Sequence, residues 1–172
     1  MLMASLSQLE ILLPELRAYA RSICGSMDDA EDLVQDAIER SLRAENVPGK
    51  LQDFRPWMFR VIHNLNIDEL RKRRVRKDYS KSEESLHQGT SHRNAAVQST
   101  YLRMAYDKLP PDMREILFLV DIMGMKYKEA SQVINVPDGT VMSRVSRARR
   151  ALAELVNGPV STDVEAVNVR KV

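Results

Sequence analysis

The stretch from Tyr127 to Leu155 restricts the fold of this chain most strongly, because it has the pattern of two short helices joined by a turn. In its second half, apolar residues recur every three or four positions and gather on one helical face: Val141, Val145, Ala148, Leu152 and Leu155. Hydroxyl and guanidinium side chains share another face: Thr140, Ser143, Arg144 and Arg147. The first half repeats the apolar spacing at Tyr127, Ala130, Val133 and Ile134. We therefore predict two helices packed against each other.

The run from Asn135 to Gly139 predicts the turn between these helices. Pro137 stops the first helix, Asp138 is a suitable N-cap for the second, and Gly139 supplies flexibility. The result is a helix-turn-helix pattern. Such a helix fits the major groove of DNA, where arginine bonds the edge of guanine and short hydroxyls reach bases or phosphates. The alternative is a solvated arginine face on an ordinary core helix.

The charge of the chain is unevenly distributed, although its net charge is only +2. One basic block lies near the middle of the chain: Arg71, Lys72, Arg73, Arg74, Arg76 and Lys77. A second lies in the final helix: Arg144, Arg147, Arg149 and Arg150. An acidic run opposes them: Asp28, Asp29, Glu31, Asp32, Asp36 and Glu39. Two basic sites and one acidic site indicate more than one partner.

Several classes of protein are excluded by what the sequence lacks. Cys24 is the only cysteine, so an internal disulfide is impossible. No apolar run reaches the roughly 18 residues that span a bilayer, and the first residues do not resemble a signal peptide, so we expect a cytoplasmic protein. His63, His87 and His92 are too scattered for a metal site, and we expect solvated surface histidines instead. No phosphate loop or nucleophile motif occurs. We expect neither catalysis nor a cofactor.

Apolar periodicity predicts further helices on both sides of a polar segment. Three precede it: one from about Leu9 to Gly25, one from about Ala30 to Leu42, and, after a loop from Ala44 to Asp53, one from Phe54 into the basic block. From Val75 to Ser99 the periodicity fails, which predicts a flexible linker. It resumes at Leu102, breaks at Pro110-Pro111 and continues into the helix-turn-helix. The prediction is an all-α fold of two small domains, 1–77 and 100–156, with a linker at 78–99 and a mobile tail at 157–172.

Three segments in this order resemble bacterial extracytoplasmic-function (group 4) RNA polymerase sigma factors. They are DAEDLVQDAIERSL (29–42), PWMFRVIHNLNIDELRKRR (56–74) and the long run LPPDMREILFLVDIMGMKYKEASQVINVPDGTVMSRVSRARRAL (109–152). The first two resemble sigma region 2 and the third resembles region 4. A helix-turn-helix alone would be a weak signal, whereas three motifs separated by a suitable linker are a strong one.

The resemblance implies a role for each segment. The helix that follows Asp28 would dock on RNA polymerase core, with Asp29, Asp32, Gln35 and Asp36 as candidate contacts; a merely solvated acidic face is the alternative. The loop 44–53 and the next helix would melt the promoter −10 element and hold one strand. Candidate contacts are Asn46, Lys50, Arg55, Arg60, Asn64, Arg71, Arg73 and Arg74. Trp57 fits the apolar series better than a stacking role, and Asp68 would orient Arg71 or Lys72.

The last helix matches the family's reader of the −35 element. Thr140, Ser143, Arg144 and Arg147 would contact bases or backbone, with Arg149 and Arg150 nearer phosphates or polymerase. Two positions depart from the family pattern: Met142 replaces a usual lysine or arginine, and Ser146 replaces a larger side chain, so the recognised sequence can differ from that of relatives.

The expected function is promoter-specific transcription initiation, in a stress or envelope response, with an anti-sigma factor as regulator. The expected partners are RNA polymerase core, promoter DNA and that anti-sigma factor, with no membrane insertion and no small-molecule substrate. Two alternatives remain: a sigma-like decoy that binds an anti-sigma regulator, and a helix-turn-helix regulator that acts without polymerase.

Overall fold

The computed structural model describes residues 2–79 and 97–157, with side chains over 6–76 and 101–157. Every element in these ranges is a helix: α1 (Leu2–Ile23), α2 (Met27–Arg43), α3 (Leu51–Tyr79), α4 (Val97–Asp107), α5 (Pro111–Leu117), the π-turn η1 (Phe118–Ile122), α6 (Tyr127–Ile134) and α7 (Asp138–Asn157). This confirms the all-α prediction. Most of the predicted linker and nearly all of the predicted tail lie outside the described residues. Among the helices described, none is long and apolar enough to cross a membrane.

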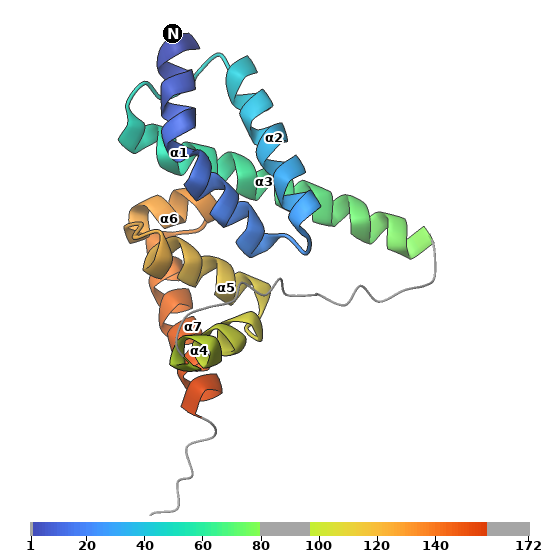
Figure 1. Cartoon of the computed structure of the whole chain (residues 1–172), viewed down its shortest axis with the longest axis vertical. Helices are drawn as coiled ribbons and strands as arrows, with labels where there is room; N and C mark the ends of the chain where they lie inside the picture. The colour runs from blue at the N-terminus through green and yellow to red at the C-terminus, as the bar shows by residue number, and fades with distance from the viewer. Residues whose placement is uncertain (1, 80–96, 158–172) are drawn as a thin grey trace, which may run out of the picture.

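The first bundle consists of α1, α2 and α3, shown in blue to green in Figure 1. Its apolar positions pack into one core: Leu9, Leu12, Leu16, Tyr19, Ala30, Leu33, Val34, Ala37, Phe54, Met58, Phe59, Ile62 and Leu65. Helix α3 begins at Leu51, so the predicted loop 44–53 is shorter than expected. The amides of Asp53 and Phe54 already bond the Lys50 carbonyl, and Gln8 Nε2 ties the loop to α1 by donating to the Gly49 carbonyl at 2.8 Å.

The second bundle consists of α4 to α7. Pro111 begins α5 directly after Pro110, which confirms the predicted break. A feature that the sequence did not predict follows: the π-helical turn η1, which ends at Ile122. Two residues later the chain turns at Gly124, whose φ of +66° suits glycine. Met125 then packs back into the core, with its amide bonded to the Leu119 carbonyl at 3.0 Å.

The helix-turn-helix is present, but its turn differs in detail from the prediction. The residue in the left-handed conformation is Asn135, with φ 54° and ψ 52°, and not Gly139. Asparagine tolerates this conformation better than most residues, so it can end α6. Asp138 lies in the first turn of α7, and the Pro137 carbonyl accepts from the amides of Thr140 and Val141. The prediction that Asp138 is the N-cap is therefore wrong by one position, and Gly139 lies within the helix.

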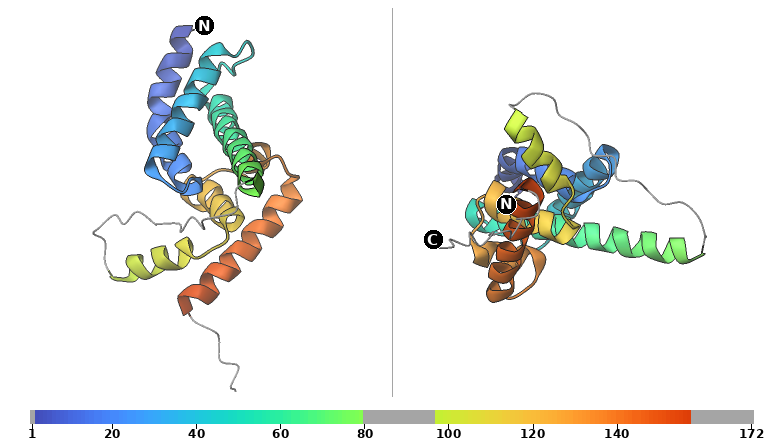
Figure 2. Two further views of the ribbon diagram at one scale, coloured as in Figure 1. Left: turned by 90° about the vertical axis from the view of Figure 1, so that its right-hand side faces the viewer. Right: turned by 90° about the horizontal axis from the view of Figure 1, so that it is seen from below.

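The two bundles lie in direct contact, which the sequence did not predict. Helix α6 packs on α3, while α5 and η1 pack on α1 (Figures 1 and 2). The buried apolar residues of both bundles form one continuous cluster. Polar contacts also cross this boundary, from Tyr19, Arg55 and His63 to the second bundle. In this conformation, the domains that the sequence presents as tethered form one packed body.

Candidate functional site

Helix α7 has two chemically distinct sides. Val141, Val145 and Ala148 are fully buried against the second bundle. On the other side, Ser143 and Arg147 are exposed, and the neighbouring Thr140 and Arg144 are half-exposed. We call these four polar residues the recognition face. The buried side fixes the helix while the recognition face lies open, which is the arrangement that a helix needs to enter a major groove. Met142 and Ser146 are exposed on the same helix.

Arg149 is held away from the recognition face. Its Nη2 donates to Asp121 Oδ1 at 2.5 Å and its Nε donates to Asp121 Oδ2 at 3.2 Å, so the two side chains form a bidentate pair. Asp121 belongs to η1, and the pair therefore joins the π-turn to α7. In this conformation Arg149 serves an internal contact, although the sequence suggested a DNA contact.

The candidate single-strand reader is spread over the loop before α3 and along α3 itself. Seven of its predicted residues are exposed: Asn46, Lys50, Arg60, Asn64, Arg71, Arg73 and Arg74. Asp68 lies 3.7 Å from Arg71 in an ion pair on the exposed surface, as predicted, and such a pair contributes little. Trp57 is half-buried and stacks on Phe54 with ring centres 5.8 Å apart, which agrees with its place in the apolar series.

Arg55, by contrast, lies between the bundles. Its Nε donates to Glu15 Oε2 at 2.6 Å, and its Nη2 donates to the Met123 carbonyl oxygen at 2.8 Å. The guanidinium carbon also lies 5.6 Å from the centre of the Phe59 ring. The structure therefore places Arg55 in an internal contact and not among the exposed cations of α3.

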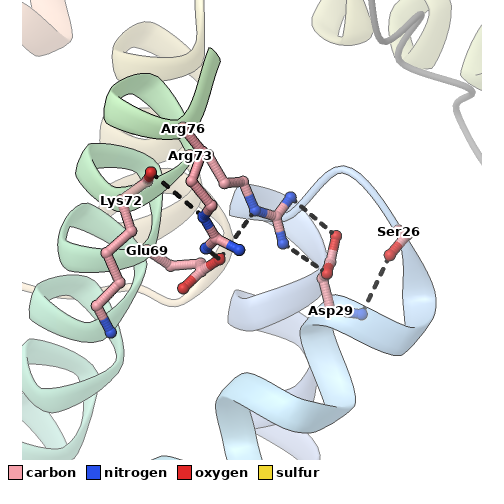
Figure 3. Close-up of polar contacts among 6 residues, drawn as sticks. All are labelled: Ser26, Asp29, Glu69, Lys72, Arg73 and Arg76. Carbon is pink, nitrogen blue, oxygen red and sulfur yellow. Dashed lines mark hydrogen bonds and ion pairs between the residues drawn. The ribbon is translucent and has the colours of Figure 1, made fainter. Parts of the chain in front are cut away.

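The acidic side of α2 splits into two parts. Asp32, Gln35 and Asp36 are exposed. Asp29 instead faces α3 and accepts two hydrogen bonds from Arg73 (Figure 3). Arg73 Nη2 donates to Asp29 Oδ1 at 2.7 Å, and Arg73 Nη1 donates to Oδ2 at 3.3 Å. The Asp29 amide also donates to the hydroxyl of the N-cap residue Ser26. Two residues predicted for different partners, Asp29 for a protein and Arg73 for DNA, therefore bind each other.

Glu69 extends this contact along α3. Its Oε1 accepts from Arg73 Nε and from Arg76 Nη2, both at 3.1 Å (Figure 3). The carboxylate thus aligns two arginines of the basic block and turns one of them towards α2. Glu69 was not among the predicted site residues; the signal that could have found it is its spacing of four from Arg73 on a helix.

Replacing Asp29 by asparagine is expected to lower the free energy of unfolding by no more than about 1 kcal/mol at pH 7, because the side chains of Asp29 and Arg73 are 35% and 46% exposed and solvent screens the pair. The hydrogen bonds from Arg73 hold the pKa of Asp29 below its ordinary value. A depressed folded-state pKa stabilises the fold at neutral pH, and this contribution is lost as the pH falls through that pKa. Urea unfolding at pH 7 and pH 3 should therefore show a smaller difference between the two proteins at pH 3.

Asp32→Asn is the matched control, because Asp32 is exposed on the same helix. It should unfold like the unchanged chain at both pH values. An equal effect of both substitutions would show that the net charge of α2, and not the contact with Arg73, sets the stability.

Two family descriptions match this arrangement of helices. "Sigma-70 region 2" matches residues 9–76, and "Sigma-70, region 4" matches residues 99–152. The ECF RNA polymerase sigma factor EcfG of Rhodopseudomonas palustris is 36% identical over 154 residues, which cover 83% of this chain and 80% of that protein. The chain belongs to the ECF RNA polymerase sigma factors. SigM of Mycobacterium tuberculosis is a more distant relative, 28% identical over 91% of this chain and 77% of its own.

A solved structure supports the same assignment for this sigma factor. The sigma factor RpoE of Bartonella quintana, in complex with the anti-sigma factor NepR, superposes with a TM-score of 0.71 at 29% identity. The match covers 88% of this chain and 96% of that one. The fold and the family expected from the sequence are therefore confirmed.

Sequence reasoning also missed the contacts between regions 2 and 4 of this sigma factor. Tyr19, His63 and Glu115 meet at one carboxylate oxygen, although Tyr19 and Glu115 are 96 positions apart. The expectation that His63 is a solvated surface histidine is wrong, since its side chain is only 13% exposed. Its position beside Asn64 on α3 was the only local signal.

Proposed function

We propose that this sigma factor directs promoter-specific initiation with three separate surfaces. The exposed part of α2 binds RNA polymerase core, the loop before α3 together with α3 reads the −10 element as a single strand, and α7 reads the −35 element as duplex. Region 2 would comprise residues 1–77 and region 4 residues 100–156, with a linker at 78–99 and a tail at 157–172. The polymerase carries out the RNA synthesis, so the sigma factor needs no catalytic group of its own.

The contrast between the buried side and the exposed side of α7 carries this proposal. A fixed helix that presents Thr140, Ser143, Arg144 and Arg147 to solvent has the donors and the geometry for reading base edges in a major groove. Met142 is 58% exposed beside them, where the family usually has a cation. The −35 sequence should therefore differ from that of relatives at the base which that cation would contact. Arg149 would join the −35 contacts only by leaving Asp121.

The exposed residues of α3 support the −10 role. A strand that leaves the duplex needs cations for its phosphates and a polar group at its bases. Arg60, Arg71 and Arg74 supply the cations, Asn64 supplies the polar group, and Asn46 and Lys50 lie on the loop that would frame a displaced base. Arg55 and Arg73 would contribute only if their internal pairs opened.

The core-binding role falls to Asp32, Gln35 and Asp36, which lie exposed on α2 and suit a basic partner surface. Asp29 would contribute after releasing Arg73. We also propose that an anti-sigma factor holds this protein inactive in the cytoplasm until a stress or envelope signal arrives. The support is the Bartonella quintana relative, whose structure was solved in complex with NepR.

Run-off transcription with purified core polymerase and genomic promoter fragments tests the proposed function. Starts that depend on the added chain are expected. Binding to an anti-sigma protein without any starts would indicate a decoy instead. DNA binding that is unaffected by polymerase would indicate an independent helix-turn-helix regulator.

A further inference from the structure

The loop between α2 and α3, residues 44–50, is tied to α1 by one side chain (Figure 1). Gln8 Nε2 on α1 donates to the Gly49 carbonyl oxygen at 2.8 Å, although the two residues are 41 positions apart. A carbonyl oxygen only accepts hydrogen bonds, so the amide nitrogen of Gln8, and not its amide oxygen, must face Gly49. The contact therefore joins the backbone of the loop to another helix of region 2.

The part of α1 that carries Gln8 is fixed by burial. Leu9 and Leu12 follow Gln8 on this helix, and they are only 6% and 3% exposed in the core of region 2. Gln8 itself is half-buried. A close-packed core holds its helices in place, so Gln8 offers the loop a rigid point of attachment.

Three successive residues of the loop are restrained. Val47 packs against the core, the ring of Pro48 restricts its backbone φ, and the Gly49 carbonyl is bonded to Gln8. The next residue, Lys50, belongs to the start of α3, because its carbonyl oxygen accepts the first two amide hydrogen bonds of that helix. The restraints on residues 47–49 therefore extend the order of α3 back into the loop.

This restrained segment separates the two loop residues that are proposed to meet the displaced strand. Asn46 and Lys50 are exposed on either side of it. The flexible stem of Lys50 can reach a phosphate from many positions, whereas the short side chain of Asn46 can bond a base only if the backbone is correctly placed. Such groups must be held within about 0.5 Å of the productive geometry. Loosening the loop should therefore affect base selection more than the general affinity for a single strand.

We propose that Gln8 is a positioning residue for base selection at the −10 element: its bond to Gly49 holds the loop in its reading conformation before the strand arrives. A loop that is ordered in advance loses less conformational entropy on binding. The inference rests on the proposed −10 role of this loop and extends that role to a residue outside it. Gln8 precedes residues 9–76, which match region 2, so this contact is not part of the family match.

Nitrogen-15 relaxation of the full chain measures the order of the loop without DNA or polymerase. Gln8→Ala removes the donor, and Gln8→Glu keeps the size of the side chain but replaces the donor by an oxygen atom. Both should lower the amide order parameters of Asn46 and Gly49 from the rigid range of about 0.85 to below about 0.6. Glu10→Ala, at an exposed glutamate of the same helix, is the control and should leave them unchanged. Circular dichroism verifies that all four chains keep their helices.

Binding of single strands by the holoenzyme is the second readout. Core polymerase with each chain is titrated with a fluorescent −10 oligonucleotide from a promoter that gives run-off starts, with the same strand changed at one base at a time, and with oligothymidylate of equal length. Both Gln8 variants should lose roughly 2- to 10-fold in discrimination at one base, as expected for the loss of one hydrogen bond. Gln8→Ala should leave the affinity for oligothymidylate unchanged, and Glu10→Ala should keep the full discrimination.

Unchanged order parameters or unchanged base discrimination in both Gln8 variants would overturn the positioning role. An equal loss of affinity for every strand would also overturn it, because the bond would then serve only the stability of the fold. If the unchanged holoenzyme showed no base preference, the proposed −10 role would fail and the role of Gln8 in base selection with it. The order parameters would still decide whether Gln8 holds the loop.

Discussion

Replacing Phe59 by alanine is expected to lower the free energy of unfolding of region 2 by about 3–5 kcal/mol, the usual cost of truncating a buried phenylalanine. Phe59 is fully buried, stacks on Tyr19 with ring centres 4.9 Å apart and lies beneath the Arg55 guanidinium. Truncation therefore removes a ring that supports both the core and the boundary with region 4. A loss of this size is a large fraction of the stability of a typical small domain.

Urea unfolding followed by circular dichroism measures this loss. Tyr101→Ala is the control, because Tyr101 is 65% exposed on α4. Its truncation should change the free energy of unfolding by less than about 0.5 kcal/mol. If the free energy of unfolding of Phe59→Ala stays within about 1 kcal/mol of that of the unchanged chain, neighbouring side chains must have moved into the vacated space. That outcome would contradict the close packing expected of a protein interior.

Local periodicity was sufficient to predict the helices and their buried faces. Leu33, Val34 and Ala37 on α2 are buried as their spacing predicts, because a helix that packs on one side must place its apolar residues there. The prediction is less accurate at helix ends. Leu42 ends the apolar series of α2 and Leu155 ends that of α7, but both side chains are exposed. The apolar pattern continues there beyond the point where the neighbouring helices can cover it.

Contacts between distant residues could not be predicted in this way. The partners in Arg73–Asp29, Arg149–Asp121 and Tyr19–Glu115 are 44, 28 and 96 positions apart, and nothing in the local sequence selects one carboxylate over another. These contacts decide which predicted site residues already have an internal partner in this conformation. Charge alone indicated that α3 and α7 are basic, whereas the tertiary structure determines that Arg73 and Arg149 pair with carboxylates, although their side chains remain 46% and 53% exposed.

Replacing Arg147 by alanine is expected to weaken −35-dependent starts by about 1–3 kcal/mol, which corresponds to roughly 5- to 150-fold in apparent affinity. Arg147 is exposed on the recognition face, and the only hydrogen bond described for it is a long one, 3.5 Å from its Nε to the Ser143 carbonyl. Its guanidinium can therefore turn to a base edge at little cost. The measurement is run-off transcription from promoters in which each −35 base pair is changed in turn.

Arg150→Ala is the matched control, because it removes the same charge from an exposed position on the same helix. An arginine that contacts only phosphate should weaken all promoters equally when it is removed and should reduce the salt dependence of binding by about one unit. Arg147→Ala should instead abolish the preference at one base pair, because the variant can no longer distinguish that pair from its replacements. If Arg147→Ala lowered every promoter by the same factor, as Arg150→Ala should, the base-reading role of Arg147 would be refuted, and α7 would read the −35 element through its other polar residues.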